Sequence, residues 1–394
     1  MQQALLIIIS LFFGLYALLI IYFKISWWGI PKFIPVPEAA VSTHISIIIP
    51  ARNEAQNIKA CLNSIINQLY PKQCFEVLVV DDHSTDSTAE IIAGYAAQNV
   101  KLISLKDFIP DGKLNAYKKK AIEIAIAQAT GELIVTTDAD CIVTPAWLQT
   151  IAGFYKKTNA QFIVMPVCFT GNNNFWGIFQ SLDFMTLQGI TGAAVHKKML
   201  SMCNGANLAY TKKAFTQVGG FEGIDTIASG DDMLLMHKIF KQYPAGVKYL
   251  RSKEVIVHTP PMPSLKDFFN QRIRWASKAD QYDDKRIFGV LLLVYLFNLS
   301  LATLPVIAVF YNPAFNVRLY PFHFIFSLVE YWALLLVMKT IIELVFLLPV
   351  ARFFNQQKLL WLFPLMQPFH IVYTIIAGWL GKFGSYHWKG RNVK

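Results

Sequence analysis

The chain has 394 residues, of which 54% are hydrophobic and only 15% are charged, and its net charge is +11. Soluble proteins carry about 25% charged residues, so this composition excludes an ordinary soluble protein. Five cysteines without a Cys-x-x-Cys spacing argue against a disulfide framework or a zinc site. The basic residues collect beside apolar segments, which is typical of cytoplasmic loops next to a membrane and indicates a bilayer, not nucleic acid, as the partner.

Apolar stretches predict membrane helices at residues 4–23, 287–311, 322–348 and 359–381. The first has no charge over 20 residues, about the length that crosses a hydrocarbon core of roughly 30 Å. Lys24 and Lys32 follow it, which predicts an external N-terminus and a cytoplasmic domain. Three further crossings would place the basic C-terminal tail outside, against the same rule. The last segment, interrupted by Pro364 and Pro368, is therefore re-entrant or interfacial, or another segment does not cross.

The region after the first helix predicts a globular α/β domain. Strand-like apolar runs occur at residues 45–49, 75–80, 100–103 and 133–137. Helical segments between them cover residues 56–69, 85–98 and 115–128. This alternation indicates βαβ units and a mostly parallel sheet, with ligands at the carboxyl ends of the strands. We divide the chain into an N-terminal helix with connector, a catalytic domain, an interfacial helix, and membrane helices with a basic tail, at residues 1–37, 38–262, 263–286 and 287–394.

Polar motifs follow these strands. Asp81 and Asp82 end the second strand and can accept hydrogen bonds from a base or ribose, while the residues after them cap the next helix. Lys113, in an Asp-Gly-Lys turn, is either a phosphate-binding cation or a surface lysine. Asp138 and Asp140 follow the fourth strand and could share one hard divalent cation, which often binds one or two carboxylates plus substrate phosphates. Asp-x-Asp alone is more often a turn, but the surrounding motifs favour a metal site.

Two further motifs lie closer to the membrane segments. Asp231 and Asp232 precede a helical run, so they could deprotonate an acceptor hydroxyl or cap that helix. Gln271, Arg274 and Trp275 share one helix face through i,i+3 and i,i+4 spacing. The guanidinium of Arg274 suits phosphate, and the Trp275 ring offers a surface for a sugar. The alternative for this helix is an interfacial Arg/Trp anchor or packing on the globular core.

The order Asp-Asp, Gly-Lys, Asp-x-Asp, Gly-Asp-Asp, Gln-x-x-Arg-Trp, with membrane helices after it, resembles the inverting family 2 glycosyltransferases. It resembles in particular their membrane-embedded branch with the Gln-x-x-Arg-Trp motif, over residues 44–280. The resemblance implies a GT-A nucleotide-sugar-binding domain inserted between one N-terminal and about three C-terminal transmembrane or interfacial helices. It also implies Mg²⁺ or Mn²⁺ as the cofactor.

The resemblance assigns roles to individual residues. Nucleotide and donor binding would involve Pro50, Arg52, Glu54, Asp81, Asp82, Lys113, Asp138 and Gly205. Binding of the diphosphate and acceptor would involve Asn207, Gln271, Arg272, Arg274 and Trp275. Asp138 and Asp140 would hold the metal. Asp232 matches the family's general base, but Asp231 stands where Glu is common, so the choice between the two stays open.

The implied function is inverting transfer of a sugar, from UDP-hexose or UDP-N-acetylhexosamine, to a lipid or lipid-linked acceptor. It would occur at the cytoplasmic face of the cell (inner) membrane, in an integral multi-pass protein. The alternative is a processive synthase that makes a poly-N-acetylglucosamine-, cellulose- or hyaluronan-like polysaccharide. Such synthases usually have more membrane helices than four apolar segments provide. A more remote alternative, a non-catalytic nucleotide-sugar-binding membrane protein, predicts a missing base or metal ligand, and neither is missing.

Overall fold

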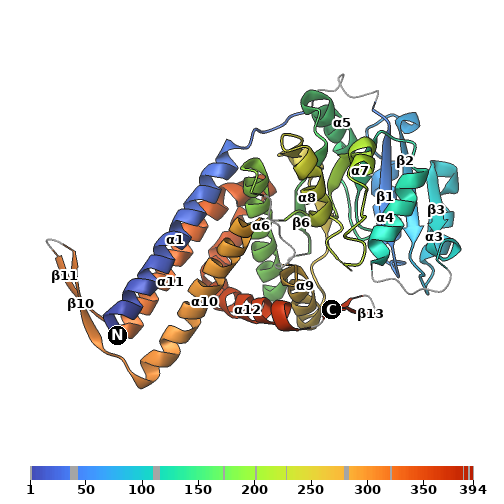
Figure 1. Ribbon diagram of the computed structural model, residues 1–394. Helices are drawn as coiled ribbons and strands as arrows, with labels where there is room; N and C mark the ends of the chain where they lie inside the picture. The colour runs from blue at the N-terminus through green and yellow to red at the C-terminus, as the bar shows by residue number, and fades with distance from the viewer. Residues whose placement is uncertain are drawn as a thin grey trace.

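The computed structural model describes residues 2–35, 43–109, 116–171, 174–199, 202–227, 229–278, 284–319, 322–384, 386–388 and 391–393. An α/β domain lies beside a group of long apolar helices (Figure 1). This arrangement confirms the predicted fold class.

A seven-stranded sheet forms the centre of the α/β domain, in the order β3-β2-β1-β4-β7-β5-β8. Its strands are β1 Ile45–Ala51, β2 Phe75–Asp81, β3 Val100–Ser104, β4 Leu133–Thr136, β5 Phe162–Val164, β7 Leu208–Thr211 and β8 Val247–Tyr249. The first four run parallel, and only β7 runs antiparallel to its neighbours β4 and β5. A second, parallel pair joins β6 Val167–Phe169 to β9 Val257–Thr259. The sheet is therefore mostly parallel, as predicted.

Both faces of the sheet are covered. The helices of the domain, besides α6 and α9, are α2 Ile58–Ile66, α3 Thr88–Ala93, α4 Tyr117–Gln128, α5 Trp147–Thr158, α7 Lys212–Gln217 and α8 Met233–Gln242. On β1, Ile48 joins a core cluster with residues of α4, whereas Ile47 and Ile49 join a second cluster with residues of α2 and α5. Since alternate side chains of a strand point to opposite faces, the burial of both sets explains the continuous apolar runs.

The helices long and apolar enough to cross a membrane, among the described residues, are α1 Gln2–Gly29, α10 Lys285–Phe310, α11 Leu328–Phe354 and α12 Phe363–Phe383. Helices α1, α10 and α11 pack on one another. The hairpin of β10 Ala314–Leu319 and β11 Phe322–Ser327 joins α10 to α11 at the end away from the sheet (Figure 1). The apolar segment predicted from residue 322 therefore begins as a strand. The helix starts at a capping box in which Ser327 and Glu330 bond each other's backbone amides.

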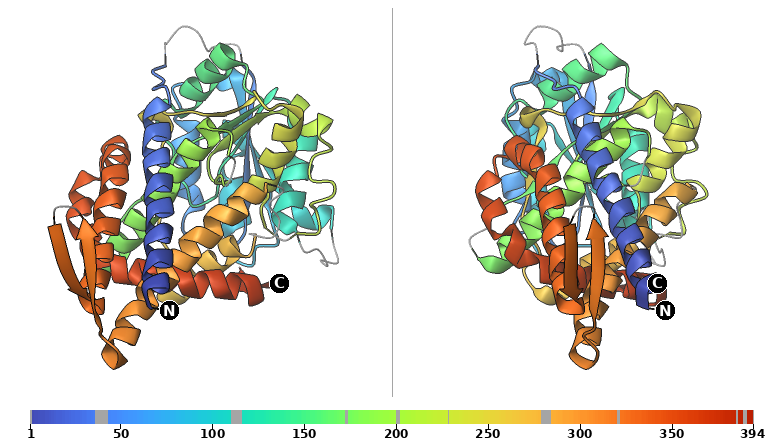
Figure 2. Two further views of the ribbon diagram at one scale, coloured as in Figure 1. Left: turned by 60° about the vertical axis from the view of Figure 1, so that its left-hand side comes forward. Right: turned by 90° about the vertical axis from the view of Figure 1, so that its left-hand side faces the viewer.

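Helix α12 has a different direction from the other three. It lies nearly horizontal in Figure 1 and in the left panel of Figure 2, whereas α1 stands steeply inclined in both views. It packs on α10 and on α9 Leu265–Ala276, the helix that carries the Gln-x-x-Arg-Trp motif. At this contact Gly381 is needed, because a Cβ there would lie 2.5 Å from the Cβ of Ala276. The Gln-x-x-Arg-Trp motif is thus supported directly by an apolar C-terminal helix.

Helix α6, Phe175–His196, joins the two parts of the molecule. It packs on β6 and β8 of the domain and on α1 and α11 of the helix group (Figure 1). A Cβ on Gly189 would lie 2.8 Å from Val350 of α11, and one on Gly192 would lie 2.8 Å from Trp27 of α1. Arg251 adds a second tie, since its Nη1 donates to the carbonyl oxygen of Trp27 at 2.9 Å and caps the end of α1. Helix α6 is therefore mostly buried between the domain and the membrane helices.

Candidate active site

A cavity of about 290 Å³ lies where β1, β2 and β4 end. This is the edge of a parallel sheet at which ligands bind. The predicted site residues that line it are Pro50, Arg52, Glu54, Asp82, Asp138, Asp140, Gly205, Asp231, Asp232, Gln271, Arg274 and Trp275. Motifs far apart in the chain therefore meet around one space.

The nucleotide end of the cavity is formed by the turns after β1 and β2. Arg52 Nη1 donates to the carbonyl oxygen of Asp82 at 2.8 Å and lies 3.7 Å from its carboxylate. His83 Nδ1 lies 3.1 Å from the same carboxylate. Asp81 does not line the cavity; it is buried, and its Oδ2 lies 3.4 Å from the amide of Ser84. Asp82 is therefore the carboxylate of this pair that faces the cavity.

Lys118, on the first turn of α4, lies at the centre of the acidic cluster. Its Nζ is 2.7 Å from Asp138 Oδ1 and 3.5 Å from Asp231 Oδ2. Burial alone would lower the pKa of Lys118, but attraction to Asp138 and Asp231 raises it well above its usual value. The sequence does not mark this lysine as a site residue, because it begins a run of three lysines that is typical of a solvated helix face. The lysine that was predicted, Lys113, lies outside the described residues.

Asp138 and Asp140 suit a divalent cation that is shared with the substrate. Both carboxylates line the cavity, and Asp140 Oδ2 accepts a hydrogen bond from Thr259 Oγ1 at 3.3 Å. Among the residues that the structure describes, no three His, Cys, Asp or Glu side chains gather to hold a metal alone. A cation here would therefore take its remaining oxygen ligands from a diphosphate, as is usual for Mg²⁺.

Asp231 and Asp232 form the second acidic pair. Asp232 caps α8: its Oδ1 accepts from the amide of Met233 at 2.7 Å, and its Oδ2 accepts from the amide of Gly205 at 3.1 Å. The carboxylate nevertheless lines the cavity, so capping and a role as base are compatible. Burial would raise the pKa of Asp231, but Lys118 and other nearby lysines bring it below its usual value.

Gly205 allows these groups to come together. A Cβ at this position would lie 3.2 Å from Asp231 Oδ2 and 3.3 Å from Lys118 Nζ. Such separations are tighter than ordinary Cβ contacts. The loop that carries Gly205 therefore contacts the acidic cluster through its backbone.

Lys119 holds the loop that leads to the acidic pair. Its Nζ donates to the carbonyl oxygens of Ile224, Ile227 and Ser229 at 2.7, 2.5 and 3.0 Å. Burial lowers the pKa of Lys119 to about 8. The sequence gives no local signal for this contact, because the loop lies more than 100 positions further along the chain.

Lys278, just after α9, is a further cavity residue. Burial lowers its pKa, and attraction to Asp232 opposes this change. It lies three residues beyond the Gln-x-x-Arg-Trp motif, so no motif in the sequence marks it as a site residue. Its position adds a cation on the side of the cavity where the base is expected.

The wall of the cavity toward the membrane helices is largely apolar, although Gln188 and Thr191 of α6 also line it. It includes Phe169, Phe184, Leu187, Met202 and Met262. The rings of Phe169 and Phe184 stack with their centroids 4.2 Å apart. Phe184 and Leu187 belong to α6, whose other contacts include α1 and α11. One chamber thus contains both the acidic cluster and an apolar surface next to the membrane helices.

Two residues predicted to contact the diphosphate or acceptor lie outside the cavity lining, which is a correction. Asn207 is fully buried; its Nδ2 donates to the carbonyl oxygens of Pro166 and Val255, both at 2.7 Å. Its Oδ1 accepts from Trp147 Nε1 at 3.0 Å, so the amide ties together parts of the core. Arg272 is also buried, and its guanidinium pairs with Asp183 of α6.

Comparison with known proteins shows the family of the chain. Residues 46–219 match the family model Glycosyl transferase family 2, and residues 133–377 match Glycosyl transferase family group 2. The chain belongs to glycosyl transferase family 2. It is therefore a glycosyltransferase, and its apolar helices indicate association with a membrane.

Relatives with assigned names are glycosyltransferases. Glycosyltransferase AglE of Haloferax volcanii is 30% identical over 224 residues, which are 56% of this chain and 67% of AglE. Poly-beta-1,6-N-acetyl-D-glucosamine synthase of Staphylococcus epidermidis is 23% identical over 59% of this chain and 53% of its own length. Beta-monoglucosyldiacylglycerol synthase of Nostoc is 27% identical over 41% of this chain. The chain spans about half of the synthase from Staphylococcus and 38% of the one from Nostoc.

A solved structure shows the same fold over nearly the whole chain. It is the mannosyltransferase PcManGT from Pyrobaculum calidifontis, in complex with GDP-Man and Mn²⁺. The TM-score is 0.58 at 19% identity, and the match covers 96% of this chain and 99% of that one. The likeness therefore includes the long helices as well as the α/β domain.

Proposed function

We propose that this glycosyltransferase moves a sugar, with inversion at the anomeric carbon, from a nucleoside diphosphate sugar to a hydroxyl of a lipid or lipid-linked acceptor. UDP-hexose and UDP-N-acetylhexosamine are the favoured donors. The observation that carries the proposal is the single cavity that combines the acidic cluster with the apolar wall of α6. A lipid acceptor would place its hydroxyl at the acidic pair and its apolar part along that wall.

The donor would bind with its nucleotide at the ends of β1 and β2. Arg52 and Asp82 would bind the base and ribose, and Lys118 and Arg274 would lie near the diphosphate. The planar guanidinium of Arg274 can make two hydrogen bonds to phosphate oxygens and stabilise the negative charge that develops on the leaving group. When bound at Asp138 and Asp140, Mg²⁺ or Mn²⁺ supplies further charge stabilisation.

Asp232 would act as the general base. Backbone amides of Met233 and Gly205 orient its carboxylate, which retains lone pairs for an acceptor proton. The acceptor oxygen forms a bond to the anomeric carbon as the bond from that carbon to the diphosphate oxygen breaks. The hydroxyl proton passes to the carboxylate, and nucleoside diphosphate leaves. Attack opposite the leaving group inverts the configuration.

We further propose three membrane crossings, by α1, α10 and α11, with α12 in the cytoplasmic interface. The exposed side chains of α12 form an apolar stripe of Leu365, Phe369, Val372, Ile376, Trp379 and Phe383. Their spacing of three or four residues puts them on one helix face, as in a helix that lies in the plane of a membrane surface. This arrangement keeps the basic C-terminal tail on the side of the catalytic domain, in accord with the positive-inside rule. The domain limits given above are part of this proposal.

The function is tested with purified protein, membrane lipid extract and a panel of UDP-, GDP- and dTDP-sugars, with and without Mn²⁺ or Mg²⁺. The proposal predicts metal-dependent release of one nucleoside diphosphate and a single new glycolipid. A ladder of oligomers would instead support the processive synthase. Donor binding without turnover for every donor would support a non-catalytic binding protein.

A further inference from the structure

Arg272 lies in the Gln-x-x-Arg-Trp motif but does not line the cavity. Its Nε and Nη2 donate to Asp183 Oδ2 at 3.0 and 2.5 Å, and both side chains are buried. Helical spacing explains the direction, because Arg272 is one residue from Gln271 and lies away from the face that carries Arg274. The motif therefore contributes side chains both to the cavity and to an ion pair behind it.

This ion pair determines how two cavity residues are presented. Arg272 Nη1 donates to Gln271 Oε1 at 2.6 Å. With its oxygen engaged, Gln271 can address an oxygen atom in the cavity through its amide nitrogen, which is a donor. The Arg272 guanidinium also lies 4.4 Å from the ring centre of Trp275, on which it stacks. Gln271 and Trp275 are thus held from behind by one arginine.

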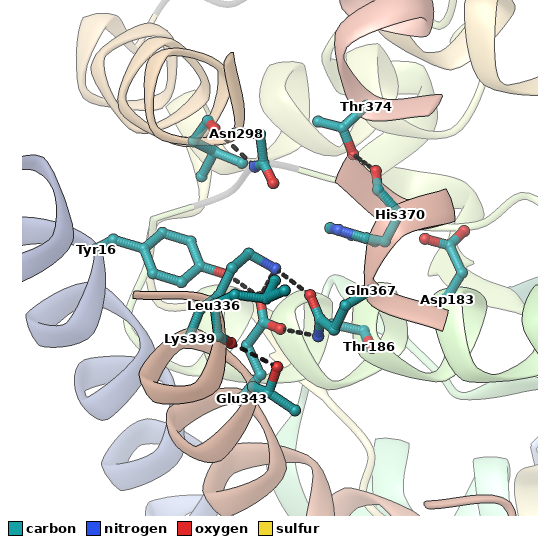
Figure 3. A network of polar contacts seen from close by, with 12 residues as sticks. Tyr16, Asp183, Thr186, Asn298, Leu336, Lys339, Glu343, Gln367, His370 and Thr374 are labelled. Atoms are coloured by element: carbon teal, nitrogen blue, oxygen red, sulfur yellow. Dashed lines mark hydrogen bonds and ion pairs between the residues drawn. The ribbon is translucent and has the colours of Figure 1, made fainter. Parts of the chain in front are cut away.

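Asp183 connects this arrangement to α12. Its Oδ1 accepts a hydrogen bond from the hydroxyl of Tyr373. The carboxylate also borders a small cavity of about 20 Å³, shared with Glu343, Gln367 and His370. Figure 3 shows Asp183 close to His370, on the side of Gln367 away from Tyr16. One carboxylate therefore receives donors from α9 and α12, which both lie next to the membrane helices.

The energetics favour a role in geometry. Replacing a buried ion pair by apolar residues is often neutral or stabilising, so such a pair is weak evidence for stability alone. Here both partners are buried, and the pair contacts residues that line the catalytic cavity. The apolar wall of that cavity comes from the same helix that carries Asp183.

We propose that Asp183 is a positioning residue for the acceptor: through Arg272 it sets Gln271 and Trp275 against the cavity, and through Tyr373 it fixes α9 to α12. The proposal rests on the proposed transfer to a lipid acceptor. The ion pair of Asp183 and Arg272 is assigned to acceptor binding because Gln271 and Trp275 lie near α6. The nucleotide end of the cavity is instead formed by Arg52 and Asp82.

The test uses purified full-length protein, the nucleotide-sugar selected by the donor screen, and dodecyl glucoside as the acceptor probe. Asp183→Asn is expected to lower kcat/KM for the acceptor at least about ten-fold, which corresponds to about 1.4 kcal/mol. The Kd of the corresponding nucleoside diphosphate should change less than about two-fold. Tyr373→Phe should also lower kcat/KM for the acceptor, by a smaller factor. Equal loss of acceptor use and nucleotide binding, or no change in either, would overturn the proposal.

Tyr331→Phe is the matched control. Its hydroxyl bonds Ser10 Oγ at 2.7 Å within the contact of α11 and α1, so it is also a tyrosine hydroxyl between long helices. Loss of this hydroxyl should leave kcat/KM for the acceptor unchanged. If Asp183→Asn does not fold, the comparison of Tyr373→Phe with Tyr331→Phe decides the proposal by the same criterion.

Hydrogen exchange separates failure of this proposal from failure of the proposed function. If the wild-type protein transfers no sugar, the proposed function fails, but amide exchange in α9 can still be measured. If Asp183 and Tyr373 fix α9 to α12, amide exchange in α9 should be faster in Tyr373→Phe than in Tyr331→Phe, with exchange in α8 unchanged. Equal exchange of α9 in the two variants would overturn the proposal that Asp183 positions α9.

Discussion

Two buried lysine–carboxylate clusters differ in how their charges are balanced. In the active site, Lys118 lies between Asp138 and Asp231, and the further carboxylates Asp140 and Asp232 line the same cavity. Negative groups therefore outnumber this lysine beside an open space. Such an imbalance is suited to a site that binds a divalent cation together with the diphosphate that shares it.

The cluster among the membrane helices is closed. Lys339 donates to Glu343 Oε1 and Gln367 Oε1, each at 2.7 Å, and Gln367 Nε2 donates to Glu343 Oε2 at 2.5 Å (Figure 3). The hydroxyl of Tyr16 bonds the same carboxylate. One lysine is paired with one acid, and the hydrogen bonds join α1, α11 and α12. The comparison teaches that a buried charge pair indicates catalysis only when unbalanced charge faces a cavity.

Metal removal should have the largest effect on the active-site cluster. Chelation, or Asp138→Asn, is expected to lower transfer on the order of a thousand-fold, because charge stabilisation by a bound metal is worth several kcal/mol. Mn²⁺ should restore the chelated wild type but not the variant. Rates of nucleoside diphosphate release measure the effect, and full activity after exhaustive chelation would contradict the metal assignment.

Lys118→Met should lower transfer about a hundred-fold, comparable to the loss of one preorganised donor in an active site. Tm should fall less than in Lys339→Met, because the carboxylates left without Lys118 border the open cavity, where water can reach them. Steady-state kinetics and Tm, measured on the same preparation, test this. A large fall in Tm with unchanged kinetics would show that Lys118 stabilises the fold and has no part in sugar transfer.

The membrane cluster should show the opposite response. Lys339→Met leaves Glu343 buried without its charge partner, and is expected to lower the free energy of unfolding by about 3–5 kcal/mol. Combining it with Glu343→Leu should recover much of that loss. Tm in detergent measures stability, while kcat/KM of the protein that remains folded should stay within about two-fold of wild type. Loss of catalysis without loss of stability would show that the Lys339–Glu343 cluster acts in sugar transfer and not in stabilising the fold.

The smallest expected effect concerns Lys119 and pH. Because the pKa of Lys119 is lowered to about 8, raising the pH from about 7 to about 9 removes its proton and one hydrogen bond to the loop, a change of a few-fold in turnover. The folded pKa lies below the unfolded value, so the contribution of this group to the free energy of unfolding rises, not falls, between these two pKa values. Turnover should therefore decline over this pH range, while the contribution of Lys119 to the free energy of unfolding does not decline. Lys119→Arg, which stays charged, should decline less than wild type over this range.

The sequence predicts the first half of the domain well and the second half poorly. Runs such as Val77–Val80 are continuously apolar because both faces of the sheet are covered, and this pattern is readable locally. β5, β6, β8 and β9 have only three residues each, so no periodicity is available. Their pairing depends on distant segments, which a local pattern does not contain.

The site shows the same division. The order of the motifs predicts many of the residues that line the cavity, but a motif does not show in which direction each side chain points. Arg272 was assigned with Gln271 and Arg274 although helical geometry places it on another face. Lys118 was hidden in a basic run, and only the folded chain shows that its Nζ contacts two carboxylates. The i,i+4 spacing of Lys339 and Glu343 is compatible with their pairing, but a local spacing does not indicate the contribution of Gln367 from another helix.

The central claim is that Asp232 takes the acceptor proton at a site whose metal and nucleotide are held by other residues. Its direct test compares Asp232→Asn with Asp231→Asn in sugar transfer and in nucleoside diphosphate binding. Asp232→Asn should lose transfer on the order of a thousand-fold while it binds nucleotide normally, and Asp231→Asn should lose less. Transfer by Asp232→Asn at the wild-type rate would contradict the account.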